Sequence, residues 1–415
     1  SSQFLMTDIY RPNNQEEISQ FIYDCYELNR PIEIITLNSK PIGRSIQCSQ
    51  TLDLSKNSGI IEYQPDELYI KVKAGTPLID ILEVLKSKNQ MLGFEPVDLG
   101  YLYNGKPNYG SIGGVVSCNL SGPRRFKSGS LRDHLLGFTA VNGKGECIKS
   151  GGTVVKNVTG YDLSKLLAGS YGTLSVLTEV TLKVVPKPEF SETFVMYGLT
   201  PKEALEVFSK VMKTSLEISG ACHYPKNNID FLRLNDLDNS KTITALRIEG
   251  PKNSVQERIE SLNKMFKDVK EKTILEIYQS DLFWKISANL ECFNNSQKIV
   301  AKISLPPTET TGFISQFCED EIMGINNKYF VEWAGGLIFL EIGNEDPSYL
   351  ILEKMKKFCK EKSAHITIMK ADNTFRTSEF FLSSSDENIK ILASKVKLSF
   401  DPKSILNPGK IYAGI

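Results

Sequence analysis

The stretch Tyr109–Arg125, YGSIGGVVSCNLSGPRR, places glycines and serines around an apolar Ile-Val-Val core and ends in a proline and two arginines. Glycine lets the backbone approach a neighbour closely, and successive N–H groups that no side chain shields form a concavity for anions. The small residues therefore indicate either sharp turns or an anionic ligand lying against the backbone.

Further glycines follow before the first clear boundary, at Gly151, Gly152 and Gly160 and then at Gly169 and Gly172. A diphosphate would use this chemistry, but ordinary turns explain the spacing equally well. The chain has no GxxxxGK[ST] loop, and its NGKGE glycines fall in a predicted hairpin turn where a dinucleotide fingerprint would need a strand–turn–helix unit. The sequence disfavours a classical ATP or NAD site and leaves turns and a ligand both open.

Composition sets the class of protein. Of 415 residues, 41% are apolar and 24% are charged, with 49 basic and 49 acidic side chains. This length predicts two domains, and the charge balance gives no support for a nucleic-acid partner or an anionic membrane. No run approaches the roughly 18 apolar residues of a membrane span, and the first residues lack a secretory pattern. We expect no direct membrane insertion.

Eight cysteines are scattered through the chain, and none forms a CxxC pair. This spacing predicts no iron–sulfur or zinc ligation and no metal site within the chain. Free thiols are typical of a reducing cytoplasm, where we expect the protein to act.

Hydrophobic periodicity predicts an α+β fold in three parts. Residues 1–187 show strands and two helices, including a hairpin around Asn142–Gly145, and end at a proline cluster. Residues 188–385 show strand–helix units, such as SETFVMYGL followed by TPKEALEVFSKVM, which favour helices on an antiparallel sheet. Residues 386–415 form a helix and a tail that docks back on the first part.

Longer segments are distinctive in order and content: LSGPRR, KNVTGYDLSKLLAGSYGTL, AGTPLIDI with MLGFEP, SLPPT, VEWAGGL and LNPGKIY. Together they resemble the flavoproteins of the vanillyl-alcohol oxidase / p-cresol methylhydroxylase (PCMH) type. Within that superfamily the chain is most similar to the FAD-binding subunits of glycolate oxidase, the smaller of the two flavin subunits. The resemblance runs from about residue 10 to the C-terminus. It implies a PCMH-type FAD-binding domain followed by an α+β cap domain.

The resemblance also implies how FAD would be held, non-covalently. The backbone of 111–114 would hold the pyrophosphate, 169–174 would line flavin and adenine, and 157–162 would form a wall near the isoalloxazine ring. Lys156 either faces the pyrimidine end of that ring or is a solvated loop lysine. The cofactor-binding residues implied are Asn38, Ser39, Lys40, Ser111, Ile112, Gly113, Gly114, Ser121, Gly122, Lys156, Asn157, Gly160, Tyr161, Asp162, Gly169, Ser170, Gly172, Thr173 and Leu174.

One loop departs from the family pattern. Paired glycines normally precede the NSK segment, and here Thr36 and Leu37 stand in their place. Side chains therefore occupy positions where the family brings its backbone close to the pyrophosphate. Neither loop offers a histidine for attaching the flavin, and Cys118 is expected to be a small buried thiol.

Catalytic residues are harder to assign. Relatives that oxidise 2-hydroxy acids carry an H-x-G-D-G-x-x-H segment, which this chain lacks. His223, His365 and Arg376 are the candidates, although His365 is also typical of a structural histidine and Arg376 of a surface ion pair. His134 is expected to belong to the scaffold of the FAD-binding domain. Other side chains have two interpretations each: Arg124 and Arg125 contact phosphate or a partner, and Trp284 and Trp333 anchor the cap or a subunit face.

The function implied is that of an FAD-binding subunit of a glycolate oxidase (dehydrogenase) complex, acting as electron relay or scaffold. Its partners would be a larger flavin subunit and an iron–sulfur subunit, with a small 2-hydroxy acid as substrate, in the cytoplasm or at the inner membrane through those subunits. Two alternatives stay open: a stand-alone FAD-dependent 2-hydroxyacid dehydrogenase, and a structural subunit that has lost FAD.

Overall fold

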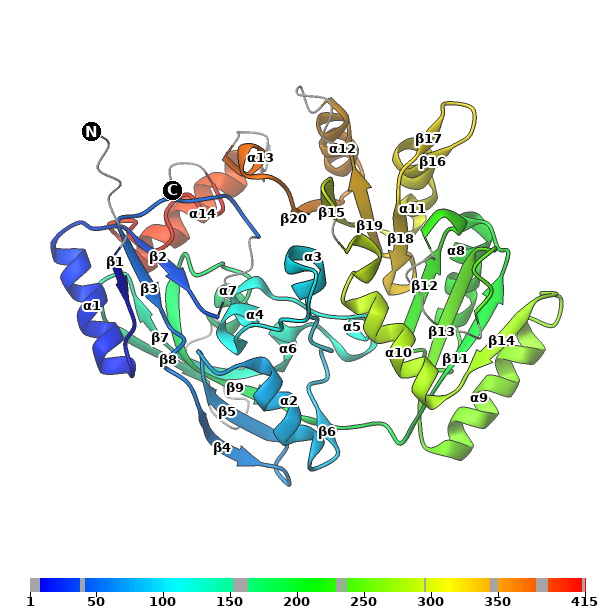
Figure 1. The fold of residues 1–415 in the computed structure, drawn as a ribbon, viewed down its shortest axis with the longest axis horizontal. Coiled ribbons are helices and arrows are strands. Elements are labelled where there is room, and N and C mark those ends of the chain that lie inside the picture. Colours follow the sequence, from blue (N-terminus) through cyan, green and yellow to red (C-terminus); the bar gives the residue numbers. More distant parts are fainter. Residues whose placement is uncertain are drawn as a thin grey trace.

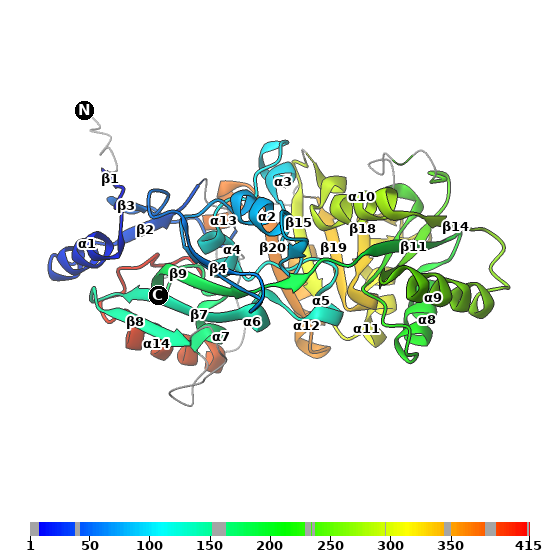
Figure 2. The same ribbon diagram turned by 90° about the horizontal axis from the view of Figure 1, so that it is seen from below.

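The computed structural model describes residues 8–37, 42–151, 163–228, 234, 237–294, 296–343, 350–377, 387–412 and 415. Its elements form two lobes that lie side by side (Figure 1). The first lobe holds the elements of 8–186 and the second holds those of 190–377, while the C-terminal helix α14 (Glu387–Phe400) returns to the first (Figure 2). Both lobes contain helices and antiparallel sheets, so the predicted α+β class is confirmed.

The first lobe contains two main sheets. A parallel three-stranded sheet has the order β1-β3-β2, and helix α1 (Gln15–Glu27) buries Ile18 and Ile22 beneath it. An antiparallel five-stranded sheet has the order β4-β5-β9-β7-β8. The predicted hairpin at Asn142 joins β7 to β8. The strands are β1 (Asp8–Tyr10), β2 (Ile32–Ile35), β3 (Gln50–Asp53), β4 (Ile60–Gln64), β5 (Tyr69–Lys73), β7 (Leu135–Asn142), β8 (Cys147–Gly151) and β9 (Ser175–Lys183).

Short helices pack on the five-stranded sheet and carry the glycine-rich stretch. Val115 and Val116 of helix α4 are fully buried in the same core as Leu78 and Ile81 of α2, which explains the apolar positions of both segments. The helices are α2 (Leu78–Lys86), α3 (Gly100–Asn104), α4 (Ile112–Cys118), α5 (Arg125–Ser128), α6 (Leu131–His134) and α7 (Leu163–Leu167), and a small sheet pairs β6 (Gln90–Met91) with β10 (Val185–Pro186).

The second lobe is one antiparallel sheet of eight strands in the order β14-β11-β13-β12-β18-β19-β15-β20. Each half of this order is a βαββαβ unit, and the two units meet where β12 pairs with β18 through His223 and Val331. The strands are β11 (Phe190–Tyr197), β12 (Gly220–Tyr224), β13 (Ile243–Gly250), β14 (Lys272–Leu275), β15 (Ile299–Ser304), β18 (Tyr329–Glu332), β19 (Leu337–Ile342) and β20 (His365–Lys370), with a hairpin of β16 (Glu319–Asp320) and β17 (Ile325–Asn326).

The two faces of this sheet have different neighbours. Most of the helices cover one face with an apolar core, whereas α10 (Ile277–Ala288) lies on the other face together with loops of the first lobe. Because strand side chains alternate between faces, Arg247, Glu249, Lys302 and Glu332 all point toward the first lobe. The outer helices are α8 (Pro201–Met212), α9 (Lys252–Met265), α11 (Pro307–Phe313) and α12 (Leu350–Glu361), and α13 (Asn373–Thr377) follows β20.

The C-terminal segment is built into the first lobe. The Lys397 ammonium of α14 donates to the carbonyl of Thr173, and Leu406 is fully buried beside strand β2. Asn407 accepts from the amide of Ile34 at 2.8 Å and donates to the carbonyl of Tyr171 at 2.9 Å. In the part of the chain that is described, no helix has the length and apolarity needed to cross a bilayer.

Candidate functional site

A hollow lies beside helix α4 in the first lobe. We call it the α4 pocket. Strand β2 and the start of β9 form two of its sides, and the C-terminal tail closes a third. Its lining includes Thr36, Ser111, Gly113, Gly114, Gly172, Ser175, Asn407 and Lys410.

The glycines of α4 shape this pocket in two ways. A Cβ on Gly113 would stand 2.8 Å from the carbonyl oxygen of Ala74, so this glycine permits close packing against the residue that follows strand β5. Gly114 meets only the hydroxyl of Ser111 within 4 Å and leaves the pocket wall open. The amides of Ile112, Gly113 and Gly114 donate to Thr76 O, Ala74 O and Ser111 Oγ. The sequence predicted a row of free backbone amides at this position. Because these three amides already have partners within the protein, α4 does not provide such a row.

Two side chains supply the unpaired polar groups instead. The Lys410 ammonium lines the α4 pocket and forms no hydrogen bond or ion pair with any described residue. Burial, together with the charge of Arg376, lowers the pKa of Lys410. The hydroxyl of Ser175 is buried in the pocket wall and also has no partner there. A desolvated cation and an unused hydroxyl suit a polar anion, and this fits the diphosphate of a dinucleotide.

Leu37, one of the two residues that replace the expected glycines, has a left-handed backbone with φ of 38°. A non-glycine residue pays about 1–2 kcal/mol for this conformation, whereas glycine adopts it freely. Thr36 has no positive φ and lines the α4 pocket. The backbone at position 37 therefore has a conformation that glycine adopts freely, although leucine stands there.

Replacing Leu37 by glycine is expected to leave the free energy of unfolding unchanged or raise it by up to about 1 kcal/mol, because relief of strain outweighs the added freedom of the unfolded chain. The matched variant Thr36→Gly should instead lower it by about 0.5–1 kcal/mol. Urea unfolding of both variants measures the difference. Equal losses would show that the backbone at Leu37 is not strained.

A second hollow lies between the lobes, and we call it the interdomain pocket. Residues 119–123, which follow α4, form its wall on the first lobe. The inner face of the eight-stranded sheet forms the opposite wall, where Lys302 pairs across strands with Phe339 and Glu332 with Leu337. Because residues 117 and 118 line the α4 pocket, the two hollows adjoin along one helix.

The interdomain pocket holds two cations and one acid. Burial and the nearby Arg125 lower the pKa of Lys302 to about 8. The Arg125 guanidinium stacks over the ring of Trp333 at 4.3 Å. Burial raises the pKa of Glu332 to about 8, and its carboxyl accepts a hydrogen bond of 3.0 Å from Ser287. At pH 7 the pocket therefore carries positive charge.

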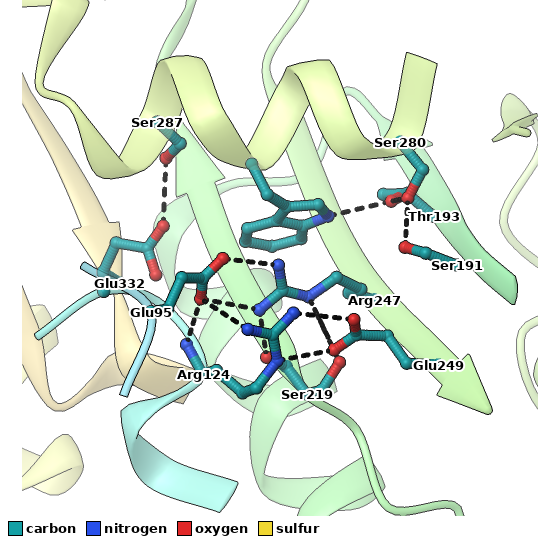
Figure 3. A network of polar contacts seen from close by, with 12 residues as sticks. Glu95, Arg124, Ser191, Thr193, Ser219, Arg247, Glu249, Ser280, Ser287 and Glu332 are labelled. Carbon is teal, nitrogen blue, oxygen red and sulfur yellow. Dashed lines mark hydrogen bonds and ion pairs between the residues drawn. The ribbon is translucent and has the colours of Figure 1, made fainter. Parts of the chain in front are cut away.

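A network of ion pairs joins the lobes next to this pocket (Figure 3). Arg247 donates to both carboxylate oxygens of Glu95 at 2.8 and 3.0 Å, and Arg124 donates to both oxygens of Glu249 at 2.9 and 2.7 Å. Burial opposes ionisation, but Arg247 and Arg124 outweigh it and hold the pKa of Glu249 at about 2. Each pair has one member in each lobe, so LSGPRR contributes an arginine to an interdomain contact within the chain.

The residues implied by the family resemblance fall into five groups. Ser111, Gly113, Gly114 and Gly172 line the α4 pocket, and Ser121 and Gly122 line the interdomain pocket. Ile112 is fully buried in the core, and the amide of Gly169 donates to Val116 O. Ser170, Thr173 and Leu174 line an apolar groove beside α14. Outside the described residues lie Asn38, Ser39, Lys40, Lys156, Asn157, Gly160, Tyr161 and Asp162.

The catalytic candidates do not come together. His223 is fully buried on the sheet face that turns away from the first lobe, and His365 is exposed at the start of β20. Arg376 donates to Gly43 O at 3.1 Å and lies beside Lys410, near the α4 pocket. Across the described ranges, no three His, Cys, Asp or Glu side chains are grouped to hold a metal ion.

Comparisons with known proteins agree with this architecture. Residues 8–151 match the model of a family described as FAD binding domain. The chain is 31% identical to the glycolate oxidase subunit GlcE of Escherichia coli (strain K12) over 96% of both chains, and 24% identical to the subunit GlcD of Bacillus subtilis (strain 168) over 98% of this chain and 88% of that one. A solved 4-ethylphenol oxidase from Gulosibacter chungangensis superimposes with a TM-score of 0.72 at 14% identity, covering 98% of this chain and 89% of that one.

Proposed function

We infer the function of this chain from its family: it belongs to the PCMH-type FAD-binding flavoproteins, among which the GlcE subunit is a relative over nearly its whole length. FAD is the cofactor of this family's binding domain. We propose that the α4 pocket takes the dinucleotide portion, with Lys410 and Arg376 beside the diphosphate and Ser175 as a further hydrogen-bond donor. Bound FAD supplies a two-electron acceptor.

We propose that the chain is the FAD-binding subunit of a complex that oxidises glycolate to glyoxylate. The observation that carries this proposal is 31% identity across 96% of both chains to a glycolate oxidase subunit, together with an open α4 pocket that has an unpaired cation. Its partners would be a larger flavin subunit, related to GlcD, and an iron–sulfur subunit. The complex would act in the cytoplasm or at the inner membrane through those subunits.

The role within the complex is also a proposal. The histidines of this chain lie outside both pockets, which favours an electron relay or scaffold beside a larger catalytic subunit. The charged interdomain pocket favours a second candidate, a flavin dehydrogenase that acts on a small hydroxy acid by itself. Absorbance of the purified chain tests for flavin, and anaerobic mixing with glycolate or D-lactate separates the two roles. Bleaching by this chain alone supports the second role, whereas absence of flavin leaves only a structural subunit.

Replacing Lys410 by methionine tests the cofactor site directly. We expect the affinity for FAD to fall by about 10–100-fold, because a charged hydrogen-bond donor facing the diphosphate is lost. The melting temperature of the flavin-free variant should rise, because a buried cation without a partner has been removed.

The matched control is Lys403→Met, which removes an exposed lysine of the same tail that donates to Tyr26 O. It should leave FAD affinity unchanged. Equal FAD affinity in Lys410→Met and the parent, measured by fluorescence titration, would place the diphosphate elsewhere.

A further inference from the structure

The eight-stranded sheet ends on one side at strand β14, whose outer edge pairs with no other strand of the described chain. The opposite edge of the sheet, β20, is protected. Its pairing with β15 has a register shift at Val300, and its Met369 carbonyl accepts a hydrogen bond from the Tyr103 hydroxyl of α3. An uncovered strand edge presents N–H and C=O groups to any strand that matches it. The outer edge of β14 is therefore a surface on which a further strand can pair.

The backbone of β14 alternates between its two sides. The amide of Tyr197 on β11 donates to the carbonyl of Glu271 at 3.0 Å. Hydrogen-bonded positions recur at every second residue of an antiparallel ladder, so Thr273 bonds to β11 as Glu271 does. The intervening residues Lys272 and Ile274 therefore direct their N–H and C=O groups to the open edge.

This edge also carries charges that the described chain does not neutralise. Glu276, the residue after β14, lies opposite Glu192 when the ladder between β14 and β11 is continued by one pair. Neither carboxylate has a hydrogen bond or ion pair with a described residue, and burial and the charge of Glu276 raise the pKa of Glu192. The Lys272 ammonium donates to Phe266 O at 2.9 Å, but no described carboxylate lies within ion-pair distance of it. Opposite charges thus stand unpaired along one strand.

A second β14 strand matches these groups when it pairs antiparallel about Ile274. Ile274 then lies opposite its own copy, and Lys272 lies opposite Glu276 of the partner subunit, twice by symmetry. Glu276 is still extended, with φ of −85° and ψ of 169°, so it continues the alternation of the strand. The register that pairs the charges therefore also aligns the outward N–H and C=O groups. A lysine on an edge normally opposes pairing, but here each lysine meets a carboxylate.

Apolar side chains beside the edge are exposed as well. Tyr278 is 78% exposed, Ile277 is 40% exposed and Ile274 is 37% exposed. Ile277 and Tyr278 form the first turn of α10 directly after β14, so they lie beside the place where the second strand begins. Tyrosine rings are frequent anchors of protein interfaces. The edge thus combines apolar area with hydrogen-bonding groups and charge.

We propose that β14 is an interface between two copies of this chain, which pair antiparallel through it to form a two-fold dimer with one continuous sheet. Both views place β14 on the side of the second lobe that is far from the first lobe, so two copies can approach there without their first lobes meeting (Figures 1 and 2). The inference goes beyond the proposed function. A dimer of flavin-free chain would support this interface while contradicting the proposed function.

Sedimentation equilibrium of the purified full-length chain tests the interface. We expect a mass of twice the 46.5 kDa of one chain, with a dissociation constant below about 10 µM. Lys272→Glu and Glu276→Lys should each raise that constant at least about tenfold, because like charges then face each other at two symmetric positions. The double variant Lys272→Glu/Glu276→Lys should regain most of the affinity, since it restores opposite charges. Glu83→Lys, an exposed charge reversal on α2 of the first lobe, is the control and should leave the dimer unchanged.

The variant Ile274→Pro tests the pairing of the backbone. Proline removes the outward N–H of position 274 and leaves the bonds of position 273 to β11, so the chain should keep its circular dichroism spectrum and become a monomer. Ile274→Val keeps the N–H and should remain a dimer. If Ile274→Pro does not fold, the charge variants decide alone.

Two results would overturn the proposal. One is a dimer whose dissociation constant is the same in the parent and in both single charge variants. The other is a parent chain that sediments as a monomer at every concentration. A monomeric chain whose β14 variants weaken only its binding to a larger flavin subunit would assign the edge to that subunit and contradict a second copy.

Discussion

Replacing Arg247 by methionine is expected to lower the free energy of unfolding by about 3–5 kcal/mol. Arg247 is 3% exposed and donates to Glu95 and to the carbonyl of Ser219, and its guanidinium lies 4.9 Å from the ring of Trp284. Removing it leaves the carboxylates of Glu95 and Glu249 in the interface with only Arg124 between them. An uncompensated buried charge is costly because neither water nor a partner replaces the lost cation.

Urea unfolding followed by tryptophan fluorescence measures this effect, because Trp284 lies against the network. The control Arg11→Met breaks an ion pair with Asp53 in which the arginine side chain is 47% exposed, and it should cost no more than about 1 kcal/mol. Adding Glu95→Gln to Arg247→Met should restore part of the stability, because it removes the carboxylate that Arg247 paired and leaves Arg124 with Glu249. If this double variant is less stable than Arg247→Met, charge compensation is not the cause.

Acid is expected to destabilise the protein through His223. Burial lowers the pKa of His223 to about 3, and its Nε2 has no hydrogen-bond partner. In the unfolded chain the His223 imidazole binds a proton below about pH 6.5, whereas in the folded chain it stays neutral until about pH 3. The stabilisation of the folded chain by neutral His223 is complete above pH 6.5. Below that value the free energy of unfolding falls by about 1.4 kcal/mol for each pH unit.

The variant His223→Gln tests this directly. Glutamine stays neutral and can still reach Thr244, the partner of Nδ1 at 2.8 Å. We expect the loss of stability between pH 6 and 5 to shrink by about 1.4 kcal/mol relative to the parent. His365→Gln, which removes an exposed histidine, is the matched control and should reproduce the parent slope. An identical slope in His223→Gln would mean that position 223 does not govern the acid response.

Local patterns predicted the fold well, and long-range chemistry was predicted poorly. The alternating apolar residues of SETFVMYGL and the turn at Asn142 correctly predicted a strand and a hairpin, because these signals depend on near neighbours. The boundary predicted after residue 187 lies between β10, which ends at Pro186, and β11, which begins at Phe190. The α+β class follows from such segments alone.

The site could be predicted only in part. The glycines of α4 were found, but the packing of Gly113 on Ala74 was not, because it depends on a contact 39 residues away in the sequence. Lys302 and Lys410 were missed because most lysines are solvated, and nothing in their surroundings reveals that they lack a partner. The tail motif LNPGKIY was the available signal for Lys410. For Lys302, the alternation of strand residues becomes informative only when the sheet order is known.

The tail that carries Asn407 and Lys410 has a consequence for how the protein is made. Residues 8–186 emerge from the ribosome first, yet the α4 pocket lacks one wall until about 220 further residues have been synthesised. At typical rates of roughly 5–20 residues per second, that interval lasts on the order of 10–40 seconds. Translation thus finishes the second lobe before the α4 pocket closes, and under the proposal that this pocket holds FAD, loading of the cofactor belongs to the end of biosynthesis.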